Sequence, residues 1–376
     1  MGLLFGSEAM KRVRWTVKTG MMMMGLAIFI SILSCNIARA NDTDLPVIDP
    51  SKVPDNVLIT YDKTNPADVV NTKMIIQAPD KTIMNFDSFN ISKDYTVDVR
   101  LPDATSSFLA RDLSGNYSYL NGTLNCNGLF ILTNTNGINV GPDAHINTQA
   151  LILSTRDITN TNFVDGKYIF EKQIDQQRDR LLLNRGEITI SKGGFGVLIA
   201  GAVENQGVII CPMGTIALAG GDCVRLDISS NKLISLAIDR EVADTIYDYN
   251  NNPITSQINN TGTLQANGGV IILKAESLPG IFEKAINLEG YVKADRLENV
   301  DGKIILEASG KVVVNTDISA SESISVKAPD ISTLKLDAPK VEVTKTIGDI
   351  TIRNSQNLDN IVTIEGGYQG DLYGHQ

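Results

Sequence analysis

The stretch that decides the fold runs from Leu129 to Ile158 and reads LFILTNTNGINVGPDAHINTQALILSTRDI. Apolar residues stand at alternate positions on both sides of the polar segment 134–137: Phe130, Leu132, Ile138 and Val140. This period of two is typical of strands with one buried face. Asn and Gly tolerate the backbone conformations of tight turns. The stretch is therefore predicted to form a strand, a turn and a second strand.

A loose repeat follows from Leu183 onward, and a repeat decides the architecture before any other feature. Its unit is Asn-x-Gly-x-aliphatic, then a glycine turn, then an aliphatic run ending in alanine; units begin at Asn184, Asn205 and Asn260, with a fourth echo at Asp301. The first two begin 21 residues apart, which suits one turn of a β-helix. Such rungs stack because one rung cannot bury its own apolar face. The interior columns are expected to hold Ile188, Val208 and Leu264, with the asparagines forming amide ladders at the corners.

The sequence thus predicts an all-β fold, a right-handed parallel β-helix (solenoid) with an N-terminal cap and short extra-helical excursions. The coil is expected to begin near Asn56. Alternating aliphatic pairs continue from Val312 and Val314 to Val362 and Ile364. A sandwich is the alternative there, but continuity with the earlier repeats favours rungs. Excursions are predicted at 166–180, which is polar without strand alternation, and at 276–286, as a short helix.

The turn and its flanks also resemble a known signature, NPNGI…FG…A.INVGGL.AST.DI. It marks the haemagglutination-activity domain, the N-terminal secretion domain of filamentous-haemagglutinin-like exoproteins exported by two-partner secretion (TpsA-type). The matching positions are Asn134, Asn136, Gly137, Ile138, Gly141, Ala144, Ile146, Asn147, Leu151, Ser154, Thr155, Asp157 and Ile158. Thr135 stands where the family has proline, a residue that would fix φ at the turn. Leu109-Ala110-Arg111 resembles the family's L.NR step, and further matches extend the resemblance over about residues 57–240.

The resemblance implies a partner, an outer-membrane POTRA-barrel transporter (TpsB-type) that recognises the domain in the periplasm and exports it. It places the recognition and secretion motif at Arg111, Asn134, Thr135, Asn136, Gly137 and Ile138. A compatible alternative is that segment 134–137 is a corner turn that supports the fold. Replacing Asn136 by isoleucine is expected to block export, because Asn136 is expected to need a turn conformation and its own local hydrogen bonds.

The N-terminus is predicted to be a secretory signal peptide, residues 1–40. Basic residues precede an uncharged run, Met21 to Leu33, and Ala38-Arg39-Ala40 supplies small residues before cleavage after Ala40. Met10 is an alternative start, and Ile32-Leu33-Ser34-Cys35 an alternative lipobox that would make Cys35 a lipid anchor. A leader (41–56), the secretion domain (57–240) and trailing rungs (241–376) follow, with the boundary in the polar segment 239–257. The expected location is secreted or at the cell surface.

Charge and cysteine content limit the possible functions and the possible disulfides. Removing residues 1–40 leaves 28 basic and 42 acidic residues, a formal charge of −14, which argues against nucleic-acid binding. Only Cys126, Cys211 and Cys223 remain. Cys211 and Cys223 are 12 residues apart and either form a disulfide or are small buried residues.

Catalysis has few candidates, so the chain is expected to be neither an enzyme nor a cofactor or metal protein. The histidines are His145, placed in a turn, and His375. The nearest carboxylate cluster is Asp239, Glu241, Asp244 and Asp248, which is expected to be solvated. The leading interpretation is a secreted exoprotein or adhesin with a host or neighbouring-cell surface receptor or glycan as a further partner. The alternative is a surface carbohydrate-binding or carbohydrate-acting β-helix, although the mature chain has no Trp.

Overall fold

The computed structural model divides the chain into two compact units, Met1–Asp42 and Thr43–Gln376. It describes residues 44–345 except 64, 67–69, 175, 177–178 and 230–233, together with three strands within 351–374. The predicted signal peptide, its cleavage site, the alternative start Met10, Cys35 and His375 lie outside these residues. All that follows concerns the second unit.

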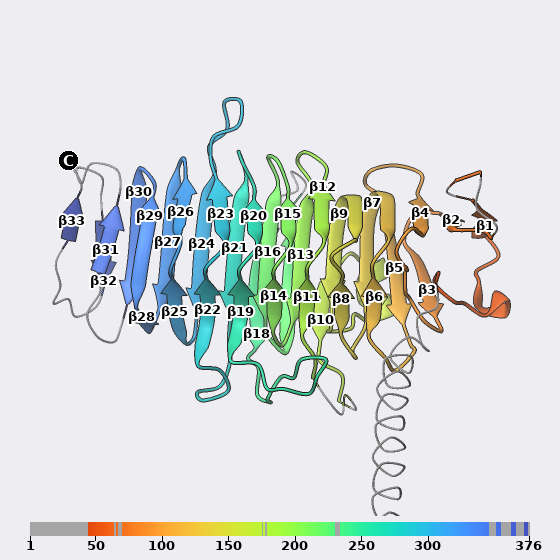
Figure 1. Ribbon diagram of the computed structural model, residues 1–376, viewed down its shortest axis with the longest axis horizontal. Helices are drawn as coiled ribbons and strands as arrows, with labels where there is room; N and C mark the ends of the chain where they lie inside the picture. Colours follow the sequence, from red (N-terminus) through yellow and green to blue (C-terminus); the bar gives the residue numbers. More distant parts are fainter. Residues whose placement is uncertain are drawn as a thin grey trace, which may run out of the picture. The chain divides into compact units, whose positions relative to one another are not determined.

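Strands stack in parallel along this unit, and Figure 1 shows the stack running from orange to blue. The N-terminal and central rungs contain β2 (Lys73–Gln77), β3 (Thr82–Phe86), β4 (Thr96–Arg100), β5 (Ser107–Asp112), β6 (Ser118–Leu120), β7 (Thr123–Thr133), β8 (Ile138–Val140), β9 (His145–Ser154), β11 (Leu182–Asn184), β12 (Glu187–Ile190), β13 (Phe195–Ala200), β14 (Val203–Asn205), β15 (Val208–Ile210) and β16 (Thr215–Gly220). Their pairings place them in two sheets of one coil.

The later rungs continue the same two sheets. They contain β19 (Ser256–Asn260), β20 (Thr263–Gln265), β21 (Val270–Ala275), β22 (Lys284–Leu288), β23 (Tyr291–Ala294), β24 (Lys303–Ala308), β25 (Lys311–Val314), β26 (Asp317–Ala320), β27 (Ser323–Ala328), β28 (Asp330–Ile331), β29 (Thr333–Asp337), β30 (Lys340–Lys345), β31 (Thr351–Asn354), β32 (Val362–Glu365) and β33 (Leu372–Gly374). The predicted right-handed parallel β-helix is confirmed, and rungs rather than a sandwich follow residue 310.

The parallel coil begins later than expected. The first elements are a 3-10 helix, η1 (Pro50–Lys52), and β1 (Leu58–Asp62). β1 pairs antiparallel with β2, whereas β2 pairs in parallel with β4. The expected start near Asn56 is therefore wrong by one element, since β1 belongs to the N-terminal cap. The sequence could not show this, because the alternation of apolar residues does not give the direction in which a strand pairs.

Aliphatic side chains form continuous columns inside the coil. Strand register places one residue of each rung in the same column: Ile146, Ile188, Ile209, Leu264, Val292, Ile318 and Leu336. All are buried. The expectation for Val208 is wrong, since it pairs with Glu187 and Thr263 and points outward while Ile209 points inward. A shift of one residue moves a side chain to the other face of a strand.

The predicted asparagine ladder is confirmed. Nδ2 of Asn184 donates to Oδ1 of Asn205 at 2.7 Å, and Nδ2 of Asn205 donates to Oδ1 of Asn260 at 2.7 Å. All three side chains are buried. Buried amides need partners, and stacking identical residues at the rung spacing supplies them.

Two excursions pack a second layer against the outside of the coil. The first contains α2 (Asn160–Val164) and β10 (Tyr168–Glu171); the second contains β17 (Cys223–Ile228) and β18 (Ile234–Arg240). β10, β17 and β18 form an antiparallel sheet. Segment 166–180 is thus an excursion as predicted, but it includes the strand β10, whose four residues are too few to show a period.

The other predicted excursion has a different local structure from that expected. Segment 276–286 contains no helix: it turns at Gly280, whose φ is +85°, and then enters β22. Pro279-Gly280 explains the turn, because proline and glycine disfavour a helix interior. The polar segment 239–257 likewise leaves the coil without interrupting the stack, since β16 pairs in register with β21. The functional division at residue 240 stays a prediction.

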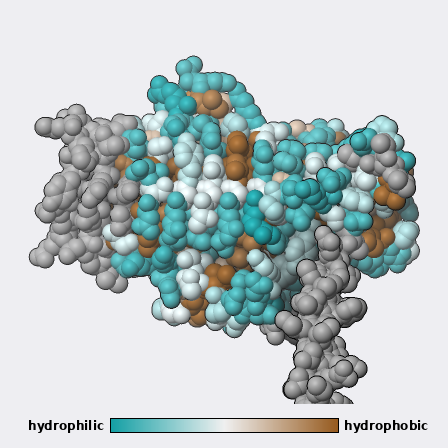
Figure 2. All heavy atoms as spheres, in the orientation of Figure 1, coloured by the Kyte–Doolittle hydropathy of each residue, from teal (hydrophilic) through white to brown (hydrophobic). Residues whose placement is uncertain are grey.

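The surface of the coil is mainly hydrophilic on the face drawn in Figure 2, where hydrophobic patches are separate from one another. No helix among the residues the structure describes is long and apolar enough to cross a membrane.

Candidate functional site

The predicted signature turn forms the corner between β7 and β8. The carbonyl oxygen of Asn134 accepts from Gly137 N at 3.1 Å, and Oδ1 of Asn134 accepts from Asn136 N at 2.8 Å. Gly137 has φ +110°, and a Cβ added there would lie 2.2 Å from Cε1 of Tyr117. Glycine is therefore required both by backbone conformation and by close packing. Ile138, at the start of β8, is fully buried.

Asn134 connects this corner to the rungs on either side. Its buried Nδ2 donates to Asn116 O at 2.8 Å and to Ser118 Oγ at 2.9 Å. Its backbone N–H donates to Ser154 O at 3.0 Å. Ser118 Oγ in turn donates to Asp112 Oδ2 at 2.5 Å. Each group of Asn134 is thus satisfied inside the protein, and losing the amide would leave buried partners unpaired.

Asn136 lies in the turn as expected, but its side chain does not form the local hydrogen bonds expected of it. Its side chain is half-buried and forms no hydrogen bond within the described part of the chain, and its φ is not positive. The expected hydrogen bonds of the Asn136 amide are therefore wrong, because the hydrogen-bonding amide belongs to Asn134. Asn136 does lie in the turn, as expected, but the positive φ belongs to Gly137. The effect of Asn136→Ile on export stays a prediction. Asparagine and glycine both fit a turn, so the sequence alone could not say which residue has the buried amide and which has the positive φ.

Thr135 links the corner to the first excursion. It occupies the second position of the turn, where proline is also favoured. Its carbonyl oxygen accepts from Nε2 of Gln176 at 2.8 Å. Gln176 Nε2 also lies 3.3 Å from Oδ1 of Asp179. The Thr135 side chain is half-buried, so the accessible side chains of the corner are those of Thr135 and Asn136.

Arg111 holds the signature segment that follows β9. Its guanidinium, on β5, donates to Asp157 Oδ1 at 2.9 Å, to Asn160 Oδ1 at 2.7 Å and to the carbonyl oxygen of Ile158. Asp157 Oδ1 also accepts from Thr133 Oγ1 at 3.0 Å. Only 8% of Arg111 is exposed. The structure therefore brings Arg111 next to the matching positions Asp157 and Ile158, with its charge already neutralised.

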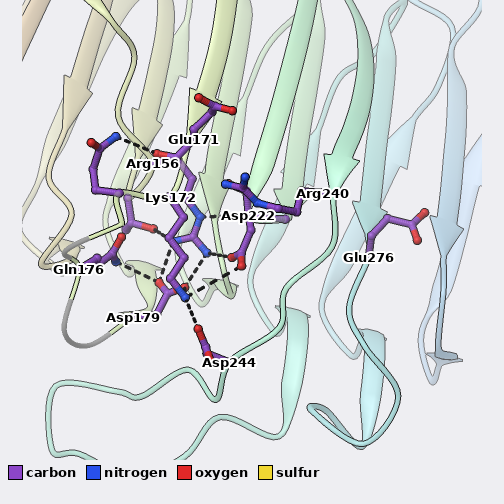
Figure 3. A network of polar contacts seen from close by, with 12 residues as sticks. Arg156, Glu171, Lys172, Gln176, Asp179, Asp222, Arg240, Asp244 and Glu276 are labelled. Atoms are coloured by element: carbon purple, nitrogen blue, oxygen red, sulfur yellow. Dashed lines mark hydrogen bonds and ion pairs between the residues drawn. The ribbon is translucent and has the colours of Figure 1, made fainter.

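A second arginine, Arg156, forms a buried ion network that the sequence did not reveal (Figure 3). Arg156 is fully buried. Its Nη1 and Nη2 lie 2.7 and 2.6 Å from the two carboxylate oxygens of Asp179, and Nη2 lies 2.8 Å from Asp222 Oδ1. Its Nε donates to Gly221 O at 2.9 Å. This two-pronged geometry is the strong form of an arginine–carboxylate pair.

Lys172 and Asp244 complete the network. Lys172 Nζ lies 2.7 Å from Asp244 Oδ2, 3.5 Å from Asp179 Oδ2 and 3.9 Å from Asp222 Oδ2. Burial raises the pKa of Asp222 against the opposing pull of Arg156 and Lys172. The hydrogen bond from Lys172 lowers the pKa of Asp244.

The network joins four separate segments: the end of β9, the loop after β10, the start of β17 and the loop after β18. It therefore fastens the antiparallel sheet to the coil. Gly201 makes room for it, since a Cβ there would lie 2.7 Å from Nη2 of Arg156. Arg156 occupies the variable position of the matched AST.DI motif, and an arginine directly after an apolar strand was the available signal.

The contacts of the other candidates do not join them in one site. Asp239 pairs with Arg225 at 3.1 Å, and Asp244 pairs with Lys172. Asp248 accepts hydrogen bonds from Asn250 N and Asn252 N at 2.8 Å each. Glu241 is exposed. His145 is the first residue of β9 rather than part of a turn, and it lies 3.6 Å from Glu187. No group of three or more His, Cys, Asp or Glu residues in the described ranges has an arrangement that could hold a metal ion.

The three cysteines within the described residues, Cys126, Cys211 and Cys223, are buried and form no disulfide. Burial raises the pKa of Cys126 to about 11, of Cys211 to about 12 and of Cys223 to about 11. They are therefore protonated thiols at neutral pH, and Cys211 and Cys223 take the second of their two expected forms, small buried residues.

The chain is similar to two curated proteins that share one name. The heme/hemopexin-binding protein of Haemophilus influenzae strain Rd is 25% identical over 306 residues, covering 78% of this chain and 32% of that protein. A second Haemophilus influenzae protein of the same name is 25% identical over 327 residues, covering 82% of this chain and 33% of its own length. This chain thus spans about a third of the curated relatives it matches.

A solved structure and a family model extend the comparison. The crystal structure of the HMW1 secretion domain from Haemophilus influenzae is 25% identical, has a TM-score of 0.56, and matches over 85% of this chain and 83% of that one. The family model of the TPS secretion domain matches residues 52–326, beyond the expected limit of the resemblance at 240. This chain belongs to the TPS secretion-domain family of TpsA exoproteins.

Proposed function

We propose that this chain is exported across the outer membrane by a POTRA-barrel transporter of the TpsB type and then acts as an exoprotein or adhesin, secreted or at the cell surface. The observation that carries the proposal is the family match over residues 52–326. A signal peptide over residues 1–40, cleaved after Ala40, would deliver it to the periplasm. Host or neighbouring-cell receptors and glycans are the partners proposed for the exported protein.

The corner contributes to this proposal in two stages. Asn134 and Ile138 are buried in the folded domain and Arg111 is almost so, so a transporter can contact them only before the domain folds. Extended segments suit such recognition because they can add a strand to a partner's sheet. We propose that the transporter recognises the unfolded segment containing these residues. After export the same residues close the corner.

Recognition and folding can be separated by measuring binding of the unfolded chain. Urea-unfolded wild type, Asn134→Ala and Asn136→Ala would be diluted onto the purified periplasmic domains of the cognate transporter. The proposal expects Asn134→Ala to bind more weakly in this assay and to be exported less from cells. Equal binding of wild type and Asn134→Ala, with a lower refolding yield for the variant, would show instead that the corner only supports the fold.

We propose no catalytic activity for this chain. The support is that Asp244 is paired with Lys172, while Asp248 accepts hydrogen bonds from its own loop. The two carboxylates are therefore not arranged as the acid and base that act together on one glycosidic bond. Incubation with a panel of polysaccharides is expected to release no reducing sugar. Release by the wild type that is lost in Asp244→Asn or Asp248→Asn would contradict the proposal.

A further inference from the structure

One column of side chains on the outside of the coil stays apolar over most of its length. Strand register aligns the following residues from rung to rung: Leu109, Ile131, Ile152, Val197, Ala217, Ile272, Ile305, Ser325 and Glu342. The residues from Leu109 to Ala217 are fully buried. Ile272 and Ile305 are half-buried, and the column becomes polar at Ser325.

The antiparallel sheet covers this column but ends before the apolar residues do. β18 is the last strand of the sheet and lies against β16 and β21. Its Leu236 and Ile238 pack on the same outer cluster as Ile272, a cluster that does not include Ile305. Neighbouring strands are about 4.8 Å apart both in the coil and in the covering sheet. One further strand beside β18 would therefore cover one further rung, that of Ile305.

β18 also has an edge to which such a strand could bind. It pairs with β17 on one side, and no strand among the described residues pairs with its other side. An unpaired edge presents N–H and C=O groups to a fourth strand. The apolar floor beside this edge is flanked by two ion pairs, Lys274–Glu307 at 2.9 Å and Lys303–Glu322 at 2.7 Å. The edge and the floor together delimit a site one strand wide.

We propose that an extended segment of a partner protein binds here as a fourth antiparallel strand, pairing with Ile234–Arg240 and placing one of its inward-facing aliphatic side chains over Ile305. The geometry argues against a second copy of this chain paired through β18. A two-fold antiparallel pair would place the second coil on the same side of the sheet as the first. That space is already occupied by β24, β27 and the rungs after them. The occupant must therefore be thin, as a single extended segment is.

A defined peptide tests the site. The probe is a synthetic peptide of about ten residues in which valine alternates with threonine, with a lysine at each end, and its control is a scrambled peptide of the same composition. The alternating peptide is expected to slow hydrogen exchange of amides in Ile234–Arg240, and the scrambled peptide is not. Absence of protection at millimolar peptide, or equal protection by both peptides, would overturn the proposal.

Two matched variants locate the binding. Ile305→Lys should weaken binding of the alternating peptide by about tenfold or more, because it places a charge beneath the bound strand. The control, Ile210→Lys, changes another half-buried outward isoleucine, on β15, and should leave binding unchanged. Both variants should keep the far-UV spectrum and melting temperature of the wild type within a few degrees. Equal weakening by both variants, or a chain that dimerises through β18, would also overturn the proposal.

Discussion

The two halves of the coil share an interior but differ on the outside. In β13 and β16 all six residues are buried. In β21 and β24 buried residues alternate with half-buried ones. The first pair lies beneath the antiparallel sheet. Of the second pair, β21 lies against the last strand of that sheet, β18, and β24 lies beyond it. An inward apolar column is thus sufficient to continue the coil, while the outward residues decide whether a rung needs a second layer.

The difference is also visible in the local sequences. β13 reads FGVLIA and β16 TIALAG, near-continuous apolar runs typical of strands buried on both faces. β27 reads SISVKA, with polar residues at alternate positions, and β24 reads KIILEA, in which outward charged residues stand on both sides of Ile305. Outward charges in the later rungs form ladders such as Lys274–Glu307–Lys327. The ion pairs of the earlier half instead include the buried Arg156 network.

The largest expected effect is at that network. Arg156→Met would leave Asp179 and Asp222 as buried carboxylates without their main partner. Breaking a buried ion pair from one side costs about 3–5 kcal/mol, so the free energy of unfolding should fall by about that amount. The free energy of unfolding can be measured by urea titration, with far-UV circular dichroism as the signal.

The matched control changes an exposed ion pair in the later half. Lys303 and Glu322 lie 2.7 Å apart with nearly half of each side chain exposed. Lys303→Met should change stability by about 1 kcal/mol or less. If the two substitutions cost the same, the buried network does not fasten the outer sheet as the geometry indicates.

The next effect compares two isoleucines of the same outward column. Ile152 is fully buried beneath the sheet and Ile305 is half-buried beyond it. Ile152→Ser should cost about 3 kcal/mol, because it leaves a cavity and buries a hydroxyl. Ile305→Ser should cost about 1 kcal/mol or less, since Ser325 already occupies the next position of the column. Thermal unfolding of the two variants gives the ranking, and a reversed order would mean that the sheet does not cover Ile152 in solution.

Much of the coil could be predicted because its information is local and repeated. The Asn-x-Gly units fixed the rung length and the ladder of Asn184, Asn205 and Asn260 in advance. Assigning Val208 instead of Ile209 to the interior shows the limit of this reasoning: in a strand of three apolar residues the inward position depends on the register set by neighbouring rungs.

The outer layer and its ion network could not be predicted in the same way. Arg156, Asp179 and Asp222 are separated by tens of residues, and no sequence period relates them. Their meeting depends on where two excursions return to the coil. The candidate corner could be predicted in part. The sequence located the turn at 134–137, but only the contacts with Asn116 and Ser118 showed that the buried amide belongs to Asn134 rather than Asn136.

A smaller effect is expected along the asparagine ladder, which also ends between the two halves. In the rungs after Asn260 the same column holds Leu288 and Val314. Asn205→Leu, in the middle of the ladder, should cost about 2–3 kcal/mol because it leaves groups of both neighbours unpaired. Asn260→Leu, at its end, should cost about 1 kcal/mol. Equal losses in urea unfolding would mean that the ladder is not continuous.

The smallest expected effect concerns the exposed end of the Arg156 network and its dependence on pH. Asp244 is paired with Lys172, but 72% of its side chain is exposed. Asp244→Asn should therefore cost only about 0.5 kcal/mol near neutral pH. The hydrogen bond from Lys172 lowers the pKa of Asp244 below its ordinary 3.8. Its contribution is thus present above pH 3.8 and is lost as the pH falls through the lowered value.

Asp222, in the same network, should show the opposite slope. Burial raises its pKa above 3.8, so the stability it contributes is fully present below that value and decreases as the pH rises through the raised pKa. Unfolding free energies of wild type, Asp244→Asn and Asp222→Asn should be measured from about pH 3 to about pH 7, a range that includes the ordinary pKa of an aspartate. The differences between wild type and each variant should change with pH in opposite directions. Parallel curves would mean that both carboxylates are solvated, and that the network does not separate a buried interior from an exposed end.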